Sequence, residues 1–181
     1  MEAAPAAIDG LLLFTLRKYA DSRGYFFESW SQQNFDRLVG TGISFCQDNF
    51  SFSRKDVLRG LHLQREPCAQ GKLVSVPSGK IFDVAVDLRP GSVTFGKHYA
   101  VELSSEDNRA LWIPEGFAHG FLVMSDHALV HYKVTKPYSP GHEASVRWDD
   151  SSLSIPWPLQ GKGPVVSEKD GSAPGLADLQ L

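Results

Sequence analysis

Apolar and polar residues alternate along the middle of the chain, which is the pattern of β-strands. In residues 81–88, Val84 and Val86 lie on one face of such a strand. Asp83 and Asp87 lie on the opposite face. This repeat of two predicts a strand with one apolar face and one polar face.

The same repeat recurs in residues 98–103 and in residues 129–134, where Val130, Tyr132 and Val134 share a face. Runs rich in proline, glycine and serine separate the predicted strands and favour turns. These runs are residues 77–79, 89–92, 114–116 and 139–141. Short strands at this spacing are typical of a sandwich, a jelly roll or a barrel, so the fold class is mainly β.

A helix is predicted over residues 32–39. Ser31 precedes it as an N-cap and Gly40 follows it as a stop, while Phe35 belongs to its apolar stripe. Residues 104–107 predict a turn or a single helical turn. The fold therefore contains a few short helices beside its strands.

The length of 181 residues suits one domain, and the 42% of hydrophobic residues suffices for a sizeable core. We expect residues 1–181 to form a single domain with a jelly-roll core at roughly 45–150. An N-terminal arm and a C-terminal segment, irregular after Trp157, are expected to pack on this core. The sequence shows no internal repeat.

Charge and cysteine content narrow the class of protein. A formal net charge of −3 lacks the basic surplus that binding to nucleic acid usually requires. No stretch approaches the roughly 20 apolar residues of a membrane span, and residues 11–14 are too short for a signal peptide. Cys46 and Cys68 lack CxxC spacing. We therefore expect reduced, buried cysteines and a cytoplasmic location.

Polar residues gather where a core strand is expected. Residues 47–53 are unusually polar, and His62 lies between two leucines. Arg59, Gln64 and Lys72 add groups that carry positive charge or form hydrogen bonds near the same pair of strands. This grouping favours an anion-binding cavity. A surface face that carries a lone histidine is the alternative, and it stays open at this point.

A second cluster, residues 112–121, contains the spacing Pro-x-Gly-x-x-His, which ends at His119. This spacing resembles the second motif of the cupin jelly-roll barrels. Metal-binding cupins usually have a His-x-His pair and a glutamate in their first motif, whereas this chain reads His62-Leu63-Gln64. Two imidazoles fall short of the three or four donors that a transition metal needs, so we expect no metal. A metal-dependent cupin enzyme is the alternative.

A longer ordered set of motifs resembles the dTDP-4-dehydrorhamnose 3,5-epimerase family, from about residue 10 to about residue 171. The set comprises Asp21-x-Arg23-Gly24-x-Phe26-x-Glu28, Gln47-Asp48-Asn49, Val57-Leu58-Arg59-Gly60-Leu61-His62, Gln70-Gly71-Lys72, Phe82-Asp83-Val84, Trp112-Ile113-Pro114, Gly116-Phe117-Ala118-His119-Gly120-Phe121, Tyr132-Lys133 and Trp148-Asp149-Asp150. Each fragment alone is weak, but the ordered set is specific.

The resemblance implies a cupin-type jelly roll that dimerises through its sheets and works without a cofactor. It also implies the substrate dTDP-4-dehydro-6-deoxy-D-glucose and the product dTDP-4-dehydro-L-rhamnose, in dTDP-L-rhamnose biosynthesis. Both C3 and C5 lie next to the C4 ketone, so enolate formation acidifies their protons. Such an enzyme needs a base, a stabiliser of the enolate oxygen and an acid on the opposite ring face.

The resemblance also implies the roles of four catalytic residues. His62 is the base, and Asp170 is the carboxylate that orients and charges it. Lys72 places positive charge near the C4 oxygen. Tyr132 returns a proton from the other face, although a tyrosine on an apolar strand face is ordinarily a core residue.

The other matched positions are expected to bind the nucleotide sugar. Arginines and a lysine suit the diphosphate, amides and a carboxylate suit thymine or deoxyribose, and aromatic rings suit stacking on the base. These residues are Arg23, Arg59, Lys169, Gln47, Asn49, Glu28, Phe26, Tyr138 and the weaker candidate Tyr19, while His119 and Glu143 match positions that contact substrate. Residues near Arg23–Glu28 are expected to reach the partner's site. The ordinary interpretations are surface charge for Glu143 and Lys169, and core packing for Phe26.

Two features depart from the family pattern or vary within it. Many relatives have histidine after Gln-Asp-Asn, but this chain has Phe50, which we interpret as affecting packing or pocket shape. Residues 65–69 form a variable loop that can tune access. An epimerase that inverts only C3 or only C5 is the nearest alternative function, in a secondary-metabolite deoxysugar pathway. A non-catalytic cupin that binds sugar nucleotides is a more remote one.

Overall fold

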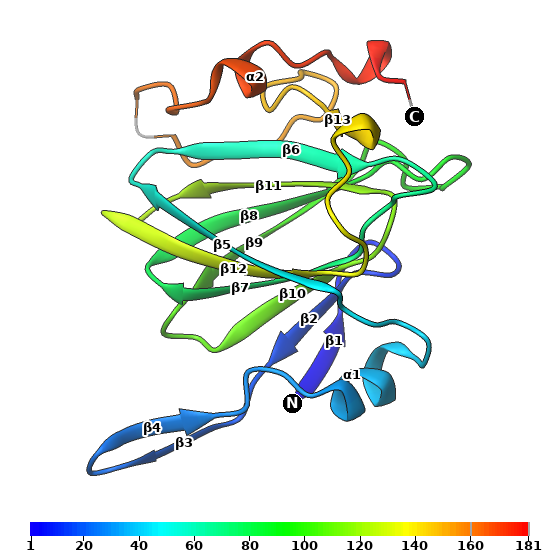
Figure 1. Ribbon diagram of the computed structural model, residues 1–181. Coiled ribbons are helices and arrows are strands. Elements are labelled where there is room, and N and C mark those ends of the chain that lie inside the picture. Colours follow the sequence, from blue (N-terminus) through cyan, green and yellow to red (C-terminus); the bar gives the residue numbers. More distant parts are fainter. Residues whose placement is uncertain (160, 181) are drawn as a thin grey trace.

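Two antiparallel β-sheets face each other in the computed structural model, which describes residues 1–159 and 161–180 (Figure 1). The six-stranded sheet has the order β1 (Glu2–Pro5), β2 (Leu12–Thr15), β10 (Arg109–Ile113), β7 (Lys72–Ser78), β12 (His127–Val134) and β5 (Gln47–Arg54). The five-stranded sheet has the order β13 (Glu143–Ser145), β6 (Leu58–Gln64), β11 (Phe117–Val123), β8 (Lys80–Asp87) and β9 (His98–Ser104). The prediction of a mainly β jelly roll is confirmed.

The remaining elements lie outside the two sheets. They are the hairpin of β3 (Lys18–Asp21) and β4 (Gly24–Phe27), helices α1 (Gln32–Val39) and α2 (Glu168–Gly171), and 3-10 helices at Pro140–His142 and Leu176–Asp178. The predicted helix over residues 32–39 is confirmed. The Ser31 hydroxyl accepts a hydrogen bond from the Asn34 amide at 3.3 Å, and Gly40 ends the helix with a φ of 121°.

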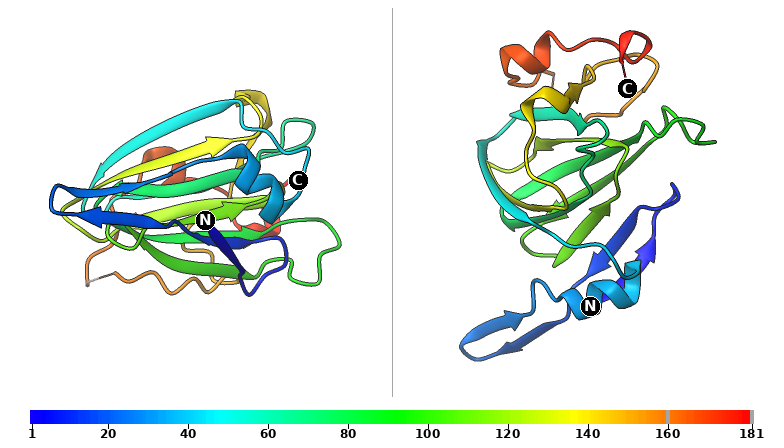
Figure 2. Two further views of the ribbon diagram at one scale, coloured as in Figure 1. Left: turned by 90° about the horizontal axis from the view of Figure 1, so that it is seen from below. Right: turned by 45° about the vertical axis from the view of Figure 1, so that its right-hand side comes forward.

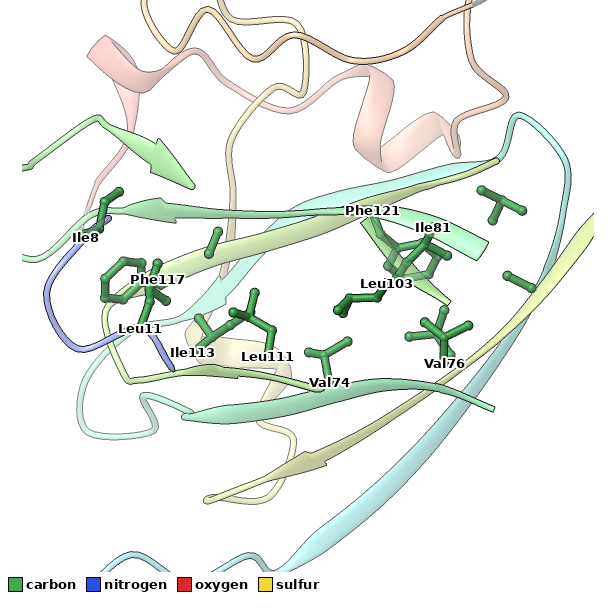
Figure 3. Packing of buried hydrophobic residues seen from close by; sticks show 14 residues of the cluster. Ile8, Leu11, Val74, Val76, Ile81, Leu103, Leu111, Ile113, Phe117 and Phe121 are labelled. Carbon is green, nitrogen blue, oxygen red and sulfur yellow. The ribbon is translucent and has the colours of Figure 1, made fainter. Parts of the chain in front are cut away.

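The main hydrophobic core fills the space between the sheets. Figure 3 shows Val74 and Leu111 of the six-stranded sheet close to Ile81 and Phe121 of the five-stranded sheet. These side chains are at most 4% exposed. Removal of this apolar surface from water is the main favourable contribution to folding, and it fixes the separation of the sheets.

Strand β8 is confirmed, but its polar face is buried. Asp83 and Asp87 are 0% exposed. They share a face with Ile81 and Ala85, which belong to the core between the sheets. The opposite face is covered by apolar residues of the C-terminal segment, such as Trp157. Alternation showed which residues share a face. In most two-sheet proteins the polar face of a strand points to solvent, but here the C-terminal segment covers the outer face, so the apolar residues point outward and the aspartates point inward.

Aromatic packing attaches the N-terminal arm to the outer face of the six-stranded sheet. Phe35 of α1 is fully buried and contacts the rings of Trp30, Phe45 and Trp112 at centroid distances of 5.1, 5.3 and 5.1 Å. Aromatic pairs at such distances contribute beyond their buried area. The β3–β4 hairpin beyond this anchor extends away from both sheets (Figures 1 and 2).

The C-terminal segment covers the outer face of the five-stranded sheet (Figure 1). A parallel bridge joins Val57 to Val165, and the Leu58 amide donates to the Val165 carbonyl at 2.9 Å. Apart from its short helices the segment is irregular, as expected. The assignment of residues 1–181 to a single domain stays a prediction, and residues 160 and 181 lie outside the described residues.

The prediction of buried cysteines is wrong. Cys46 is exposed and Cys68 is partly exposed, and both are free. Cys46 precedes β5 at the rim of the sheet, where its thiol contacts the Val134 carbonyl at 3.7 Å. In the described ranges, no helix has the length and apolar character that crossing a membrane requires.

A close backbone contact joins β6 to β11 beside the expected catalytic histidine. His62 lies opposite His119 in the register, which shifts between His119 and Phe121. A Cβ atom on Gly120 would lie 2.7 Å from the Arg59 carbonyl oxygen and 3.0 Å from the Gly60 Cα. A larger residue at position 120 therefore cannot fit without moving backbone that carries both histidines.

Gly120→Ala is expected to lower the free energy of unfolding by about 2 kcal/mol, because the added methyl group overlaps the backbone of β6. Gly141→Ala is the control, since its Cβ would meet no heavy atom within 4 Å. The control is expected to change stability by less than about 0.5 kcal/mol. Urea unfolding measures both variants, and equal effects would contradict the importance of this contact.

Candidate active site

A cavity of about 440 Å³ lies between the two sheets. Side chains from β5, β6, β7, β11 and β12 line it. Ten of the residues predicted from the sequence are among them: Gln47, Asn49, Arg59, His62, Gln64, Lys72, His119, Tyr132, Tyr138 and Glu143. The interpretation of His62 as a lone surface histidine is therefore excluded.

His62 pairs with Asp170, which comes from α2 in the C-terminal segment. The His62 Nε2 atom lies 2.6 Å from Asp170 Oδ1, and Asp170 is 4% exposed. Burial raises the pKa of the Asp170 carboxyl, but hydrogen bonds from His62 and from the Gly60 amide outweigh burial and hold this pKa below its ordinary value. Asp170 is therefore ionised, and its charge stabilises a protonated imidazole.

Lys72, the first residue of β7, places a buried amine beside this pair. It is 8% exposed, and its Nζ donates to the His62 carbonyl at 3.1 Å. Burial lowers the pKa of Lys72 to about 8, against the opposing effect of the carboxylates of Asp83 and Glu143. The amine therefore stays mainly protonated at neutral pH.

Tyr132 lines the cavity from the six-stranded sheet, whereas His62 belongs to the five-stranded sheet that faces it. It shares a face of β12 with Val130 and Val134, as predicted, and pairs with Asn49 across β5. Burial raises the pKa of the Tyr132 phenol, and the positive charge of Arg59 only partly opposes this. The phenol is therefore protonated near neutral pH and able to donate its proton.

His119 forms a second pair of a histidine with a carboxylate. Its Nε2 atom lies 2.8 Å from Asp83 Oδ1, and the exposed fractions of the two side chains are 8% and 0%. We did not predict Asp83 as a site residue. The alternation in residues 81–88 put it on a polar face, but gave no sign that this face lies inside the barrel.

Polar contacts organise the nucleotide-binding candidates at the mouth of the cavity. The Glu143 carboxylate pairs with the Lys169 ammonium at 2.6 Å and accepts from the Tyr138 hydroxyl at 2.8 Å. Burial raises the pKa of Glu143, but these two contacts outweigh it and lower the pKa. Glu143 and Lys169 are thus parts of one network rather than separate surface charges.

Arg59, Gln47 and Asn49 also have fixed partners. Arg59 Nε donates to the Ser53 hydroxyl at 2.9 Å. Gln47 Nε2 donates to Asn49 Oδ1 at 2.8 Å, and Gln47 Oε1 accepts from the Tyr138 amide at 3.2 Å. These contacts orient polar groups along the cavity side of β5.

Three residues of the predicted binding set lie away from this cavity, as does the weaker candidate Tyr19 on β3. Arg23 and Phe26 belong to the β3–β4 hairpin, where Arg23 pairs with Asp21 and Phe26 is 69% exposed. Glu28 follows the hairpin and accepts from Asn34 Nδ2 at 2.8 Å. The exposure of Phe26 rules out its interpretation as ordinary core. The structure does not bring these residues to the chain's own cavity.

Phe50 does not shape the cavity. It lies on the outer face of β5, is 65% exposed, and stacks on His131 with a centroid distance of 4.7 Å. The cavity-facing residues of this strand are its odd-numbered neighbours, Asn49 and Ser51. Of the two interpretations of Phe50, pocket shape is therefore wrong, and packing on the outer face remains.

The cavity also contains residues that the sequence prediction missed. These are Ser51, Leu63, Gln70, Gly120 and Phe121. Ser51 was detectable, because it continues the alternation of Gln47 and Asn49 along β5. Gln64 ties the cavity to the variable loop 65–69, since its Nε2 donates to the Cys68 carbonyl at 2.7 Å.

Within residues 1–159 and 161–180, no group of three or more His, Cys, Asp or Glu residues is placed to hold a metal ion. In His62 and His119, one ring nitrogen is already engaged by a carboxylate.

Lys72→Met is expected to stabilise the protein at pH 7, because folding then no longer buries an ammonium group. The folded-state pKa of Lys72, about 8, lies below its ordinary 10.5, so the unfolded state binds more protons between these values. The stability of the unmodified protein therefore rises with pH across this window. The advantage of Lys72→Met is expected to shrink by about 3 kcal/mol between pH 7 and pH 10.5.

Urea unfolding at several pH values measures this change. Lys55→Met, at an exposed position, serves as the control and is expected to show no comparable trend. A constant difference between Lys72→Met and the unmodified protein would contradict the burial of a charged amine.

Comparison with known proteins agrees with this geometry. The model of the dTDP-4-dehydrorhamnose 3,5-epimerase family matches residues 5–178. The protein of that name from Salmonella typhimurium is 51% identical over 97% of this chain and 95% of its own length. The crystal structure of dTDP-6-deoxy-D-glucose-3,5-epimerase from Legionella pneumophila, in complex with dTDP-4-keto-L-rhamnose, has a TM-score of 0.93 and 47% identity, and the match covers 97% of this chain and 93% of that one.

The same fold also occurs in an enzyme with a narrower outcome. A 3'-monoepimerase from Streptomyces bikiniensis, in complex with dTDP-quinovose, has a TM-score of 0.90 and 33% identity, and the match covers 96% of this chain and 87% of that one. The extent of the family match and the identity to the double epimerases settle the assignment. This chain belongs to the dTDP-4-dehydrorhamnose 3,5-epimerase family.

Proposed function

We propose that this protein inverts C3 and C5 of dTDP-4-dehydro-6-deoxy-D-glucose to give dTDP-4-dehydro-L-rhamnose. The observation that carries the proposal is one cavity lined by His62, Lys72 and Tyr132, with Asp170 behind His62. Proton transfer next to a ketone needs a base, an acid and a group that stabilises the enolate oxygen. The family assignment supports the choice of substrate.

His62 acts as the base that removes the proton from the carbon next to the C4 ketone. Its Nε2 atom faces Asp170 at 2.6 Å, so Nδ1 is the nitrogen that accepts the proton. The charge of Asp170 then stabilises the imidazolium that forms. Because this carboxylate is held ionised, it favours the transfer without taking up the proton itself.

Lys72 stabilises the enolate. The electron pair released at C3 or C5 moves to the C4 oxygen, where the ammonium of Lys72 offsets its negative charge. The low exposure of Lys72 strengthens this interaction, because water screens a buried charge poorly. The C4 ketone and Lys72 together supply the electron sink, so we propose that no cofactor takes part.

Tyr132 returns a proton to the opposite face of the sugar. His62 belongs to the five-stranded sheet and Tyr132 to the six-stranded sheet, so the base and the acid approach the cavity from opposite sides. Inversion of a carbon requires this arrangement, since a proton returned from the side of removal restores the original configuration.

The polar rim of the cavity binds the nucleotide. Arg59 and Lys169 suit the two phosphates, and Gln47 and Asn49 offer amides to thymine or deoxyribose. Tyr138 is available for stacking on the base, while Glu143 and His119 contact the sugar part. We also propose a cytoplasmic location, because free cysteines suit a reducing compartment.

We propose further that the protein works as a homodimer in which the hairpin of one protomer completes the site of its partner. Phe26 and Tyr25 are 69% and 59% exposed, and neither lines the chain's own cavity. Exposed aromatic side chains of this kind commonly mark a contact surface. Arg23, Phe26 and Glu28 would then contact the nucleotide held by the partner.

Incubation of the protein with dTDP-4-dehydro-6-deoxy-D-glucose in D₂O is expected to exchange the protons at both C3 and C5. Proton NMR measures this exchange, and a reductase that traps the product tests its L configuration. Exchange at one carbon only would replace the double epimerase with a single epimerase. Binding of the nucleotide without any exchange would contradict catalysis on this substrate.

Tyr132→Phe is expected to slow epimerisation more than exchange, because proton removal by His62 precedes proton return. The loss of product is expected to be ~10²–10⁴-fold, as for removal of other general acids. His62→Ala is the matched comparison and should abolish exchange and epimerisation together. Equal losses of exchange and product in Tyr132→Phe would contradict its assignment as the acid.

Phe26→Ala is expected to lower kcat/KM about tenfold or more, because stacking of a base on an aromatic ring contributes about 1–3 kcal/mol. Co-expression with His62→Ala tests the dimer. A mixed dimer pairs an intact His62 with an intact Phe26 in one of its two sites. Because about half of the dimers are mixed when the two variants pair at random, about a quarter of the unmodified activity is expected. Activity no higher than that of the separate variants would show that the hairpin serves its own chain.

A further inference from the structure

The buried carboxylate of Asp83 has no part in the steps above. It is 0% exposed, and its Oδ1 atom lies 2.8 Å from His119 Nε2. Its Oδ2 atom is also buried and has no hydrogen-bond partner among the described residues. Buried carboxylate oxygens are normally satisfied, so one left unpaired beside an active site needs an explanation.

Asp87, on the same strand, is an example of a buried carboxylate with a purely structural role. Like Asp83, it is 0% exposed and lies on the inward face of β8. Both of its oxygens are satisfied, by Arg89 at 2.9 and 2.7 Å and by the hydroxyls of Ser92 and Thr94 at 2.6 Å each. No such cation or hydroxyl contacts Asp83 within the described residues, so its charge is left to act on its surroundings.

Lys72 is the cavity group on which this charge acts. The titratable and charged groups around Lys72 are Asp83 (β8), His119 (β11), His62 and Arg59 (β6), Tyr132 (β12) and Glu143 (β13). Of the two carboxylates in this set, Glu143 is already engaged by Lys169 at 2.6 Å. Asp83 is the better source of negative charge for the buried amine, because no lysine or arginine of the described residues pairs with it, whereas Lys169 partly neutralises Glu143.

We propose that Asp83 is a positioning residue of the epimerase, whose negative charge keeps Lys72 protonated and fixes the tautomer of His119. This role rests on the proposed function. An ionised carboxylate accepts a hydrogen bond, so Nε2 of His119 carries the proton and Nδ1 is the nitrogen that contacts the substrate. Lys72 stabilises an enolate only as an ammonium ion, and a fully buried amine retains its proton only where negative charge compensates its lost hydration.

Asp83→Asn tests the first part of the proposal, because it removes the charge and keeps the shape. The alkaline limb of the pH profile of kcat/KM reports the loss of the Lys72 proton, since the pKa of Tyr132 lies above its ordinary 10.0. This limb is expected to move to lower pH by about one unit or more in Asp83→Asn. The acid limb is expected to stay in place, because Asp83→Asn leaves the contact between His62 and Asp170 unchanged.

Asp87→Asn is the matched control, because it neutralises an equally buried carboxylate on the same face of β8. It is expected to lower stability without moving the alkaline limb. Equal profiles for Asp83→Asn and the unmodified protein would overturn the proposal. Loss of exchange in the unmodified protein would instead overturn the function itself, so the two failures are distinguishable.

A second measurement needs no folded Asp83 variant. Nitrogen NMR of the histidine rings in the unmodified protein shows which ring nitrogen carries the proton, and the His119 signal is assigned from its loss in His119→Gln. A proton on Nε2 of neutral His119 is expected. A proton on Nδ1 would mean that a protonated Asp83 donates the hydrogen bond to Nε2 of His119. Asp83 would then carry no negative charge, and the proposal would be overturned.

Discussion

The compensation of charge inside an otherwise apolar barrel is the constraint on which the site depends. A charge buried without a partner costs several kcal/mol, so each ionised group between the sheets needs an opposite charge or strong hydrogen bonds. Asp170 pairs with His62, and Asp83 pairs with His119. The negative charges of Asp83 and Glu143 both favour the protonated form of Lys72. The pairs come from different strands and from α2, so the site is complete only when the whole fold is.

Strand pairing supplies the geometry that these charges require. The close approach of β6 and β11 at Gly120 sets His62 opposite His119, and the facing sheet brings Tyr132 to the other side of the cavity. The separation of the sheets depends on the apolar core shown in Figure 3. Packing far from the chemistry thus determines how far apart the proposed base and acid stand.

Local signals predicted local structure well. Ser31 and Gly40 bounded α1, and the alternation of residues located β8 and β12. Alternation, however, states which residues share a face and not whether that face is inside. For this reason Asp83 was missed as a site residue. The sequence also left two interpretations of Phe50 open, packing or pocket shape, and its exposed position on the outer face of β5 leaves only packing.

The resemblance to a family predicted most of the cavity, because ordered motifs carry long-range information that periodicity lacks. It named Asp170, which lies 108 residues from His62. That separation has a consequence for how the protein matures. A ribosome synthesises every strand of both sheets before it reaches the segment that holds Asp170. The carboxylate that charges His62 is therefore the last of the proposed catalytic groups to be made, and until α2 has docked the imidazole lacks its partner.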